Sequence, residues 1–257
     1  MKVVILCGGF GTRLREQTEF MPKPMVSVGG KPILWHIMKI YYHQGFTEFI
    51  LPLGYKGEII KEYFVHYRWM SQDFTLEYTE ENRIEFHDER NLENWKIHFV
   101  DTGVRTLTGK RVNLIKHLLE EDDCFMLTYG DGVADIDLKE LLEYHKKMGC
   151  AATITGFRPK QRFGIVGEKG GKVTKFKEKP DMTDWINCGF MVFENRALEY
   201  FTDDDVMLEK VTLPDIASDG ELAIYTHRGC WHYMDTQRDY ERINKIWEED
   251  PQWKIWD

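Results

Sequence analysis

The sequence predicts an α/β fold in which a mostly parallel, Rossmann-like central sheet is flanked by helices. Short apolar runs alternate with segments of helical apolar spacing, which is typical of strand–helix–strand crossover units. A stretch of period-two alternation at residues 75–100 interrupts this order and predicts a small antiparallel insertion. No Pro-, Gly- or Ser-rich linker divides residues 1–257, so we expect a single domain.

The first half of the chain supplies the first crossover units. Residues 3–6, Val-Val-Ile-Leu, form a continuous apolar run that fits a strand buried on both faces. A helix is predicted to begin at Pro32, whose fixed φ suits the first helical position, and to end at Gly45. The same patterns predict strands at 49–53 and 125–129 and helices at 57–67 and 111–120.

The second half continues the alternation and ends in a helix. The apolar pattern predicts a helix at 138–147, a strand at 151–157 and a short strand at 231–233. The pair Gly170-Gly171 between two strand-like runs predicts a hairpin at 164–178. Residues 236–257 are expected to form a C-terminal helix and tail.

The composition restricts the classes of function. The net charge of −9 argues against a general nucleic-acid binder, which carries a basic face. The apolar runs are shorter than a signal peptide or a membrane span requires, so we expect no membrane partner and a cytoplasmic location. The five cysteines are scattered and odd in number, which fits reduced thiols and gives no zinc-ligand spacing.

Three glycines directly follow the first predicted strand, at positions 8, 9 and 11. Ligands bind outside the carboxyl ends of parallel strands, and glycines let backbone N–H groups approach a phosphate closely. A tight turn without a ligand is the alternative reading. The dinucleotide fingerprint fails because Leu14 stands where a glycine or alanine is needed, which argues against a nicotinamide dehydrogenase. The Walker loop fails because Pro32 follows Gly30-Lys31.

Charged residues near strand ends suggest which anion is bound. Arg13 follows the glycine turn, and Lys23 is stiffened by prolines on both sides, so it is suited to reach the same ligand. Asp131 and Asp235 follow strand-like segments and carry the oxygen ligands that Mg²⁺ prefers. Each aspartate alone is equally consistent with a turn or a helix cap, and the sequence does not show whether the two converge.

Together these motifs resemble the signature of the sugar-phosphate nucleotidyltransferases. The glycine turn with Arg13 and the segment Pro22-Lys23-Pro24-Met25 carry the resemblance. Further similarity lies at residues 34–39, 100–103, 129–135 and 234–239. The resemblance runs nearly end to end and is greatest to members that use CTP and α-D-glucose 1-phosphate, including the insertion before residue 100. It implies a Mg²⁺-dependent reaction that yields CDP-glucose and diphosphate, for CDP-sugar biosynthesis of the deoxyhexose and O-antigen type.

The resemblance also implies roles for individual residues. The catalytic residues would be Arg13, Lys23 and Asp131, and the metal ligands would be Asp131 and Asp235. The nucleotide would be bound by Leu6, Gly8, Gly9, Gly11, Thr12, Arg13, Lys23, Thr106, Arg111 and Gly130. The sugar phosphate would be bound by Gly164, Glu178, Lys179 and Asn187. Cys7 and Phe10 depart from the usual Ala and Leu without removing a charge or a glycine.

Two alternatives to this function stay open in the sequence. The first is a nucleotidyltransferase that uses another nucleoside triphosphate or another sugar 1-phosphate. The second is a non-catalytic relative that binds sugar nucleotides, although every charged residue of the signature is present. A homo-oligomer is expected in either case, because the strand edges of the insertion need cover.

Overall fold

The computed structural model describes residues 1–9, 11–78, 83–87, 92–160, 163–180 and 182–256. Phe10 of the glycine turn and residues 79–82 and 88–91 of the predicted insertion lie outside the described residues.

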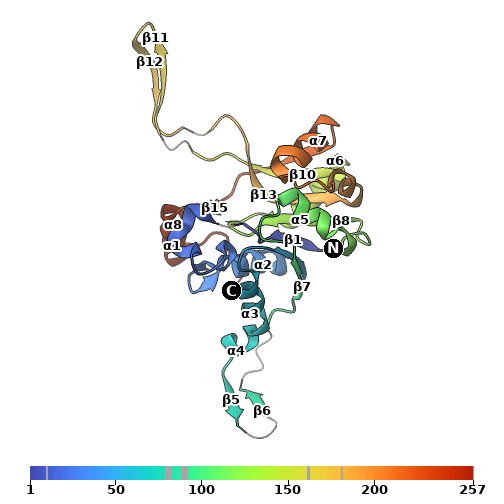
Figure 1. Cartoon of the computed structure of the whole chain (residues 1–257). Helices are drawn as coiled ribbons and strands as arrows, with labels where there is room; N and C mark the ends of the chain where they lie inside the picture. Colours follow the sequence, from blue (N-terminus) through green and yellow to red (C-terminus); the bar gives the residue numbers. More distant parts are fainter. Residues whose placement is uncertain (10, 79–82, 88–91, 161–162, 181, 257) are drawn as a thin grey trace.

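A seven-stranded sheet forms the centre of the described part of the chain (Figure 1). Strand β13 runs antiparallel to β10 and β8, whereas the other neighbouring pairs run parallel. The predicted mostly parallel α/β fold is therefore confirmed. In spatial order the strands are β14 (Leu222–His227), β10 (Ala152–Phe157), β13 (Ile186–Glu194), β8 (Cys124–Tyr129), β1 (Val3–Leu6), β4 (Glu48–Leu53) and β7 (Lys96–Asp101).

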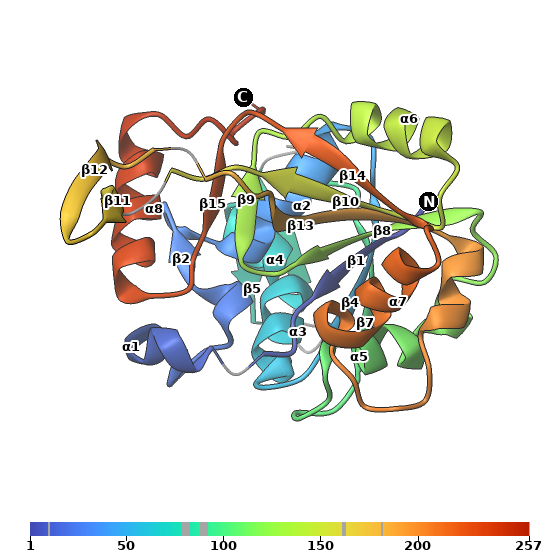
Figure 2. The same cartoon turned by 90° about the horizontal axis from the view of Figure 1, so that it is seen from above.

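Apolar side chains alternate between the two faces of this sheet. In β1, Val3 and Ile5 join one hydrophobic core, while Val4 and Leu6 join a second core on the opposite face. The first core is covered by α2 (Ile33–His43), α3 (Gly57–Val65), α6 (Leu138–Met148) and α8 (Gln237–Glu249). The second is covered by α5 (Thr108–Leu114), the π-helix η5 (Leu208–Thr212) and α7 (Leu213–Ser218). Both α5 and α7 contact η5 on this face, and Figure 2 shows α8 beside β2 (Ser27–Val28) and β15 (Trp231–Tyr233).

Local sequence signals set the ends of the helices. Asp137 caps α6 by accepting hydrogen bonds from the backbone N–H groups of Lys139 and Glu140, both at 2.9 Å. Gly149 ends this helix with a φ of 65°, a conformation that glycine adopts without strain. Thr236 and Asp239 form a reciprocal capping box at the start of α8.

The antiparallel insertion is smaller than the sequence predicted. Strands β5 (Phe74–Glu77) and β6 (Arg83–Phe86) form the expected antiparallel hairpin. The prediction was wrong for residues 96–100, which lie in β7 and pair in parallel with β4 at the edge of the central sheet. The run Lys-Ile-His-Phe in β7 alternates polar and apolar residues, so this edge strand resembles a hairpin strand in sequence.

Two hairpins project from the body in opposite directions (Figure 1). One is β5–β6, which is carried by α4 (Tyr67–Ser71). The other is β11 (Ile165–Lys169) with β12 (Lys172–Lys177), the hairpin predicted from Gly170-Gly171. The remaining short elements of the described residues are α1 (Arg15–Thr18), β3 (Lys31–Pro32), β9 (Gly132–Ala134) and the 3₁₀ helices η1 (Thr12–Leu14), η2 (Lys23–Met25), η3 (Lys116–Leu118) and η4 (Asn195–Tyr200).

The C-terminal tail packs on the body. Trp253 is fully buried and Trp256 nearly so, and both pack around His36 on α2. These tryptophans therefore pack within the chain.

Candidate active site

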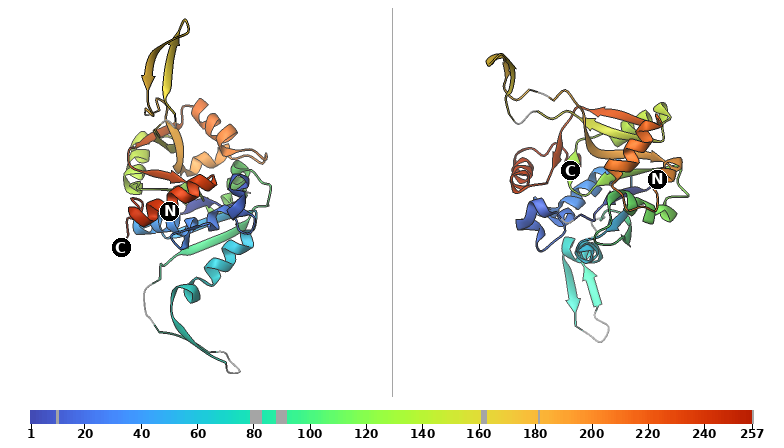
Figure 3. Two further views of the ribbon diagram at one scale, coloured as in Figure 1. Left: turned by 90° about the vertical axis from the view of Figure 1, so that its left-hand side faces the viewer. Right: turned by 45° about the horizontal axis from the view of Figure 1, so that its top comes forward.

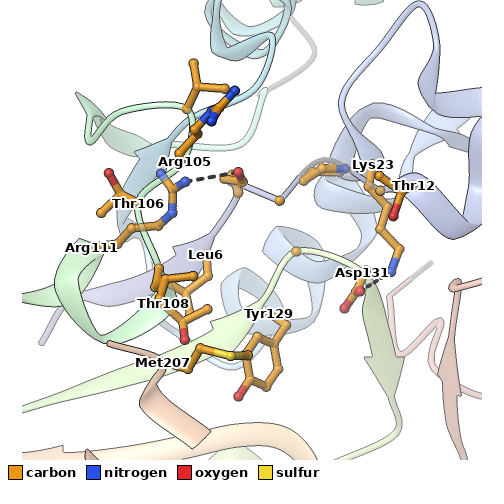
Figure 4. Close-up of a pocket in the computed structure, with 18 of the residues that line it drawn as sticks. Leu6, Thr12, Lys23, Arg105, Thr106, Thr108, Arg111, Tyr129, Asp131 and Met207 are labelled. Carbon is orange, nitrogen blue, oxygen red and sulfur yellow. Dashed lines mark hydrogen bonds and ion pairs between the residues drawn. The ribbon is translucent and has the colours of Figure 1, made fainter. Parts of the chain in front are cut away.

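A cavity of about 410 Å³ lies where β1, β7 and β8 end, at the carboxyl edge of the parallel strands. This volume is typical of a small-molecule site. Figure 4 shows Lys23 and Asp131 at one end of the cavity, and Thr106 and Arg111 at the other. The cavity is lined by every residue that the sequence assigned to nucleotide, catalysis or metal: Leu6, Gly8, Gly9, Gly11, Thr12, Arg13, Lys23, Thr106, Arg111, Gly130, Asp131 and Asp235.

Glycines in the turn allow close approach of other chain segments. A Cβ atom on Gly8 would lie 2.0 Å from Cζ of Arg111, so a larger residue would displace the guanidinium. A Cβ on Gly130 would lie 2.9 Å from the ring of Pro24. Gly11 has a φ of 63°, and its carbonyl accepts a hydrogen bond from Leu14 that begins the next helical turn. Because these glycines lack a Cβ, Arg111 packs closely against Gly8 and Pro24 packs closely against Gly130.

A cluster of four charges lies at one end of the cavity. The ammonium of Lys23 donates hydrogen bonds to the carboxylates of both Asp131 and Asp235, the latter at 2.5 Å. Arg13 donates to the other carboxylate oxygen of Asp235 at 2.6 Å. The two aspartates come from segments more than 100 residues apart. The sequence did not show whether they converge; in the structure, both carboxylates contact the same ammonium group.

The charges of this cluster favour the ionised forms of Lys23 and Asp235. Burial alone would lower the pKa of Lys23, but the charge and hydrogen bonds of Asp131 and Asp235 outweigh it and raise that pKa. Burial likewise opposes ionisation of Asp235, yet Lys23 and Arg13 lower its pKa overall. The ion pair between Lys23 and Asp235 is therefore stabilised in its charged form.

Arg111 forms part of the opposite wall. Its guanidinium donates to the backbone carbonyls of Leu53, at 2.8 Å, and of Gly8, at 3.0 Å, and to the hydroxyl of Thr102, at 2.5 Å. The side chain is almost completely buried, and burial lowers its pKa. These bonds tie the glycine turn to the ends of β4 and β7. Arg111 thus fixes the shape of the cavity, and its role in binding the nucleotide stays a prediction.

Several lining residues were not predicted from the sequence, among them Arg105, Thr108, Tyr129 and Met207. Tyr129 donates to Glu209 at 2.5 Å, and Thr108 donates to the other oxygen of the same carboxylate at 2.9 Å. Burial, followed by the charge of Glu209, raises the pKa of Tyr129. The position of Tyr129 directly before Gly130-Asp131 could have indicated a place in the site. Its hydrogen bond to Glu209 could not be predicted, because the two residues are 80 positions apart.

The four predicted sugar-phosphate residues lie outside the lining of this cavity. Glu178 and Lys179 follow β12, form an ion pair at 3.5 Å and are each 61% exposed. Gly164 lies beside them, since a Cβ there would be 3.0 Å from a carboxylate oxygen of Glu178. Asn187 lies on β13, where it accepts a hydrogen bond from the backbone N–H of Gly189 at 2.9 Å. The structure thus groups three of the four at the base of the β11–β12 hairpin.

Asp131 and Asp235 supply the oxygen ligands that a hard divalent cation prefers. Among the residues that the structure describes, no group of three or more His, Cys, Asp or Glu side chains could hold a metal by itself. Mg²⁺ is commonly held by one or two carboxylates together with water and substrate phosphates, and it does not require a complete protein cage. The donor set therefore fits a magnesium ion that is bound together with a nucleotide.

The family model for nucleotidyl transferases matches residues 2–249. The chain therefore belongs to the nucleotidyl transferase family. Among curated proteins it is 46% identical over 258 residues to a probable glucose-1-phosphate cytidylyltransferase from Bacillus subtilis. It is 44% identical over 259 residues to the glucose-1-phosphate cytidylyltransferase from Salmonella typhimurium. Both comparisons cover 100% of each chain.

Solved structures share the fold at lower identity. The crystal structure of HddC from Yersinia pseudotuberculosis has a TM-score of 0.70 at 24% identity, covering 96% of this chain and 99% of HddC. A putative glucose-1-phosphate thymidylyltransferase from Bacillus anthracis has a TM-score of 0.69 at 16% identity. The comparison covers 97% of this chain and 96% of that protein. These likenesses support the architecture and carry no argument about the substrate. Within the described residues, none of the helices has the length and apolar character needed to span a bilayer.

Proposed function

We propose that this protein transfers the cytidylyl group of CTP to α-D-glucose 1-phosphate, which yields CDP-glucose and diphosphate. One observation carries the proposal: the glycine turn, Arg13, Lys23, Asp131 and Asp235 share one cavity in a chain that matches cytidylyltransferases over its full length. The sequence contains every charged residue of the family signature. A catalytic enzyme is therefore favoured over a relative that only binds sugar nucleotides.

The chemistry requires positioning and compensation of charge more than acid–base catalysis. A phosphate monoester dianion is already a nucleophile, so no general base is needed to activate it. Two like charges about 4 Å apart repel by roughly 4 kcal/mol in a partly exposed site, and a sugar phosphate meeting CTP brings several such pairs together. Arg13, Lys23 and the backbone N–H groups of the glycine turn reduce that repulsion, because they offer fixed positive groups to separate oxygens.

Each end of the cavity has its own part in the reaction. The turn at Gly8, Gly9 and Gly11 receives the triphosphate, and the sugar phosphate attacks the α-phosphorus in line, so that diphosphate leaves over the turn. Thr106 and Arg111 face the nucleoside from the far wall, with Leu6 and Gly130 between the two ends. Lys23 brings its positive charge to the α-phosphate, at the junction of both substrates.

Asp131 and Asp235 would hold a magnesium ion. When bound, Mg²⁺ neutralises phosphate charge and polarises the bonds at the phosphorus. The two carboxylates, which lie against Lys23 at one end of the cavity, would hold such a cation there. The positive charges of Lys23 and Arg13 are already paired with the two carboxylates. An additional cation would therefore be needed to neutralise the negative charge of the triphosphate.

The sugar phosphate is assigned to residues around the base of the β11–β12 hairpin. Glu178 would accept hydrogen bonds from sugar hydroxyls, Lys179 would pair with the sugar phosphate, and Gly164 and Asn187 would shape the pocket. The exposed ion pair of Glu178 and Lys179 supports this assignment, since both side chains are accessible to a ligand. All four residues lie outside the cavity lining, so their assignment depends on the family resemblance and on this exposure.

The test measures diphosphate release over a grid of CTP, UTP, dTTP, ATP and GTP against several sugar 1-phosphates. We expect the pair CTP and glucose 1-phosphate to give a kcat/KM at least tenfold above every other pair, and the reaction to stop when EDTA removes Mg²⁺. A different preferred nucleotide or sugar would correct the substrates and leave the reaction class standing. Absence of turnover with every pair would overturn the proposal.

We further propose that the protein acts in the cytoplasm as a homo-oligomer. The five cysteines are unpaired, which suits a reducing compartment. The projecting hairpins leave strand edges and apolar side chains exposed in one copy of the chain, and these surfaces support association.

A further inference from the structure

The ammonium of Lys23 is paired with both carboxylates to which the proposed function assigns Mg²⁺. It donates to Oδ2 of Asp131, as Figure 4 shows, and to Oδ1 of Asp235 at 2.5 Å. Arg13 donates to Oδ2 of Asp235 at 2.6 Å, so each oxygen of that carboxylate already has a cationic donor. A divalent cation bound by both aspartates must therefore displace a donor, because two cations repel strongly at such short range.

Lys23 is the donor that controls access to these carboxylates. It contacts both aspartates, and only 12% of its side chain is exposed. Arg13 contacts Asp235, and 76% of its side chain is exposed. Exposed ion pairs are weak, since water competes for both partners. The more buried contacts of Lys23 thus present the greater obstacle to a cation.

The backbone that bears the two aspartates is held together without Lys23. Asp131 directly precedes β9, and Asp235 lies two residues after β15. These strands pair with each other, and the backbone N–H of Met234 donates to the carbonyl of Asp131 at 3.0 Å. Segments from both ends of the chain meet here, and Figure 3 shows the N-terminal part (blue) beside α8 (red), which follows Asp235. The two carboxylates should therefore stay close when Lys23 changes its partner.

Lys23 can change its partner without a rearrangement of the chain. Pro22 and Pro24 restrict its backbone, and Pro24 is buried against Gly130. Its ammonium, by contrast, ends a flexible four-carbon side chain. The glycine turn lines the same cavity, so phosphate oxygens bound at that turn would offer the ammonium a second set of acceptors.

We propose that Lys23 excludes divalent cations from Asp131 and Asp235 in the nucleotide-free protein, so that this site binds Mg²⁺ only together with the triphosphate. The proposal rests on the proposed function, which assigns Mg²⁺ to the aspartates and the triphosphate to the glycine turn. The triphosphate draws the ammonium away, and the released carboxylate oxygens become available to the metal. Nucleotide and cation then each strengthen the binding of the other, because such coupling is reciprocal.

The test measures Mn²⁺ binding to the full-length protein without nucleotide. Mn²⁺ is the probe because it shares the oxygen-ligand preference of Mg²⁺, and its free concentration is measured by electron paramagnetic resonance. Lys23→Met replaces the ammonium with a neutral, unbranched side chain. We expect this variant to bind Mn²⁺ with a Kd at least tenfold below that of the original protein, because no ammonium competes for the carboxylates. Lys23→Arg keeps the charge and should bind as weakly as the original.

Two controls place the effect at this site. The double variant Lys23→Met/Asp235→Asn should lose the gained affinity, since it lacks one of the two carboxylates. Lys245→Met removes the same charge from an exposed position on α8 and should leave the Kd of Mn²⁺ unchanged.

Thermal unfolding gives a second measurement, which also serves if Lys23→Met is unstable without metal. Mn²⁺ alone should raise the Tm of Lys23→Met and leave that of the original protein unchanged. A CTP analogue with a methylene bridge between the α- and β-phosphorus should make the original protein respond, so that Mn²⁺ with the analogue raises its Tm above the value with the analogue alone.

The proposal is overturned if, without nucleotide, the original protein binds Mn²⁺ as tightly as Lys23→Met does. It is also overturned if Lys23→Arg or Lys245→Met gains the same affinity, if the double variant keeps it, or if the analogue leaves the original protein unresponsive to Mn²⁺. Failure of the proposed function is seen separately, as absence of diphosphate release from every substrate pair, because these binding measurements require no turnover.

Discussion

At the scale of single residues, Lys23 has the most constrained position in the site. Its ammonium lies between two carboxylates and is largely buried, with 12% of the side chain exposed. The prolines on both sides hold the backbone, and Pro24 also packs against Gly130. The lysine therefore keeps the two aspartates together and holds a positive charge where the substrates meet.

Replacing Lys23 with alanine should lower kcat about 100-fold or more, the usual effect of removing one fixed positive donor from a phosphoryl-transfer site. Diphosphate release under saturating substrates measures the change. Lys245→Ala is the control, because this exposed lysine on α8 pairs only within its own helix, and its kcat should stay within twofold. A Lys23→Ala protein that is folded and within fivefold of normal turnover would contradict the catalytic assignment.

The two aspartates have different partners, but mutation of either should weaken the binding of Mg²⁺. Asp235 pairs with both Arg13 and Lys23, whereas the described partner of Asp131 is Lys23. Asp131→Asn and Asp235→Asn should each raise the Mg²⁺ concentration for half-maximal rate at least tenfold, since each removes one charged oxygen ligand. A magnesium titration of initial rates provides the measurement. Unchanged magnesium dependence in both variants would show that the metal binds elsewhere.

At the scale of elements, Glu209 connects three parts of the cavity wall. Its carboxylate on η5 accepts hydrogen bonds from Tyr129 at the end of β8 and from Thr108 at the start of α5. The hydroxyl of Thr108 in turn accepts a hydrogen bond from the backbone N–H of Leu208 at 2.8 Å. This network fixes the distance between the helix that bears Arg111 and the strand end that bears Asp131.

Glu209→Ala should raise the KM for the nucleotide about tenfold, because it removes two hydrogen bonds worth roughly 1 kcal/mol each and loosens the wall. Tyr129→Phe removes one of these bonds and should have a smaller effect of the same kind. Glu199→Ala, an exposed glutamate on the body, is the control and should leave KM unchanged. Equal KM values for the Glu209→Ala variant and the original protein would limit this network to a role in stability.

Sequence reasoning predicted elements and strand-end residues better than contacts between distant segments. The glycine turn and Asp131 could be predicted because each directly follows an apolar strand, and parallel strands end at one edge. The network around Glu209 could not be predicted, since no local pattern pairs residues 80 positions apart. Strand β7 was misassigned because alternation of polar and apolar residues does not give the direction of the neighbouring strand.

At the scale of the whole molecule, buried His36 makes the free energy of unfolding depend on pH. The side chain is fully buried on α2, against Trp247, Trp253 and Trp256, and its Nε2 bonds to the carbonyl of Val28 at 2.8 Å. Burial lowers the pKa of His36 to about 4, from 6.5. The folded protein therefore keeps this imidazole neutral at pH values where the unfolded chain binds a proton.

The free energy of unfolding should consequently decrease as pH falls from about 6.5 to about 4, because the unfolded state binds more protons in this interval. The share of His36 is about 3 kcal/mol, from a pKa difference of roughly 2.5 units. Urea unfolding at a series of pH values measures the slope. His36→Gln should flatten it, even if the variant is less stable at pH 7, whereas His117→Gln, at an exposed position, should not. A slope that stays equal in the His36→Gln variant would mean that other groups, such as buried His145, carry the whole dependence.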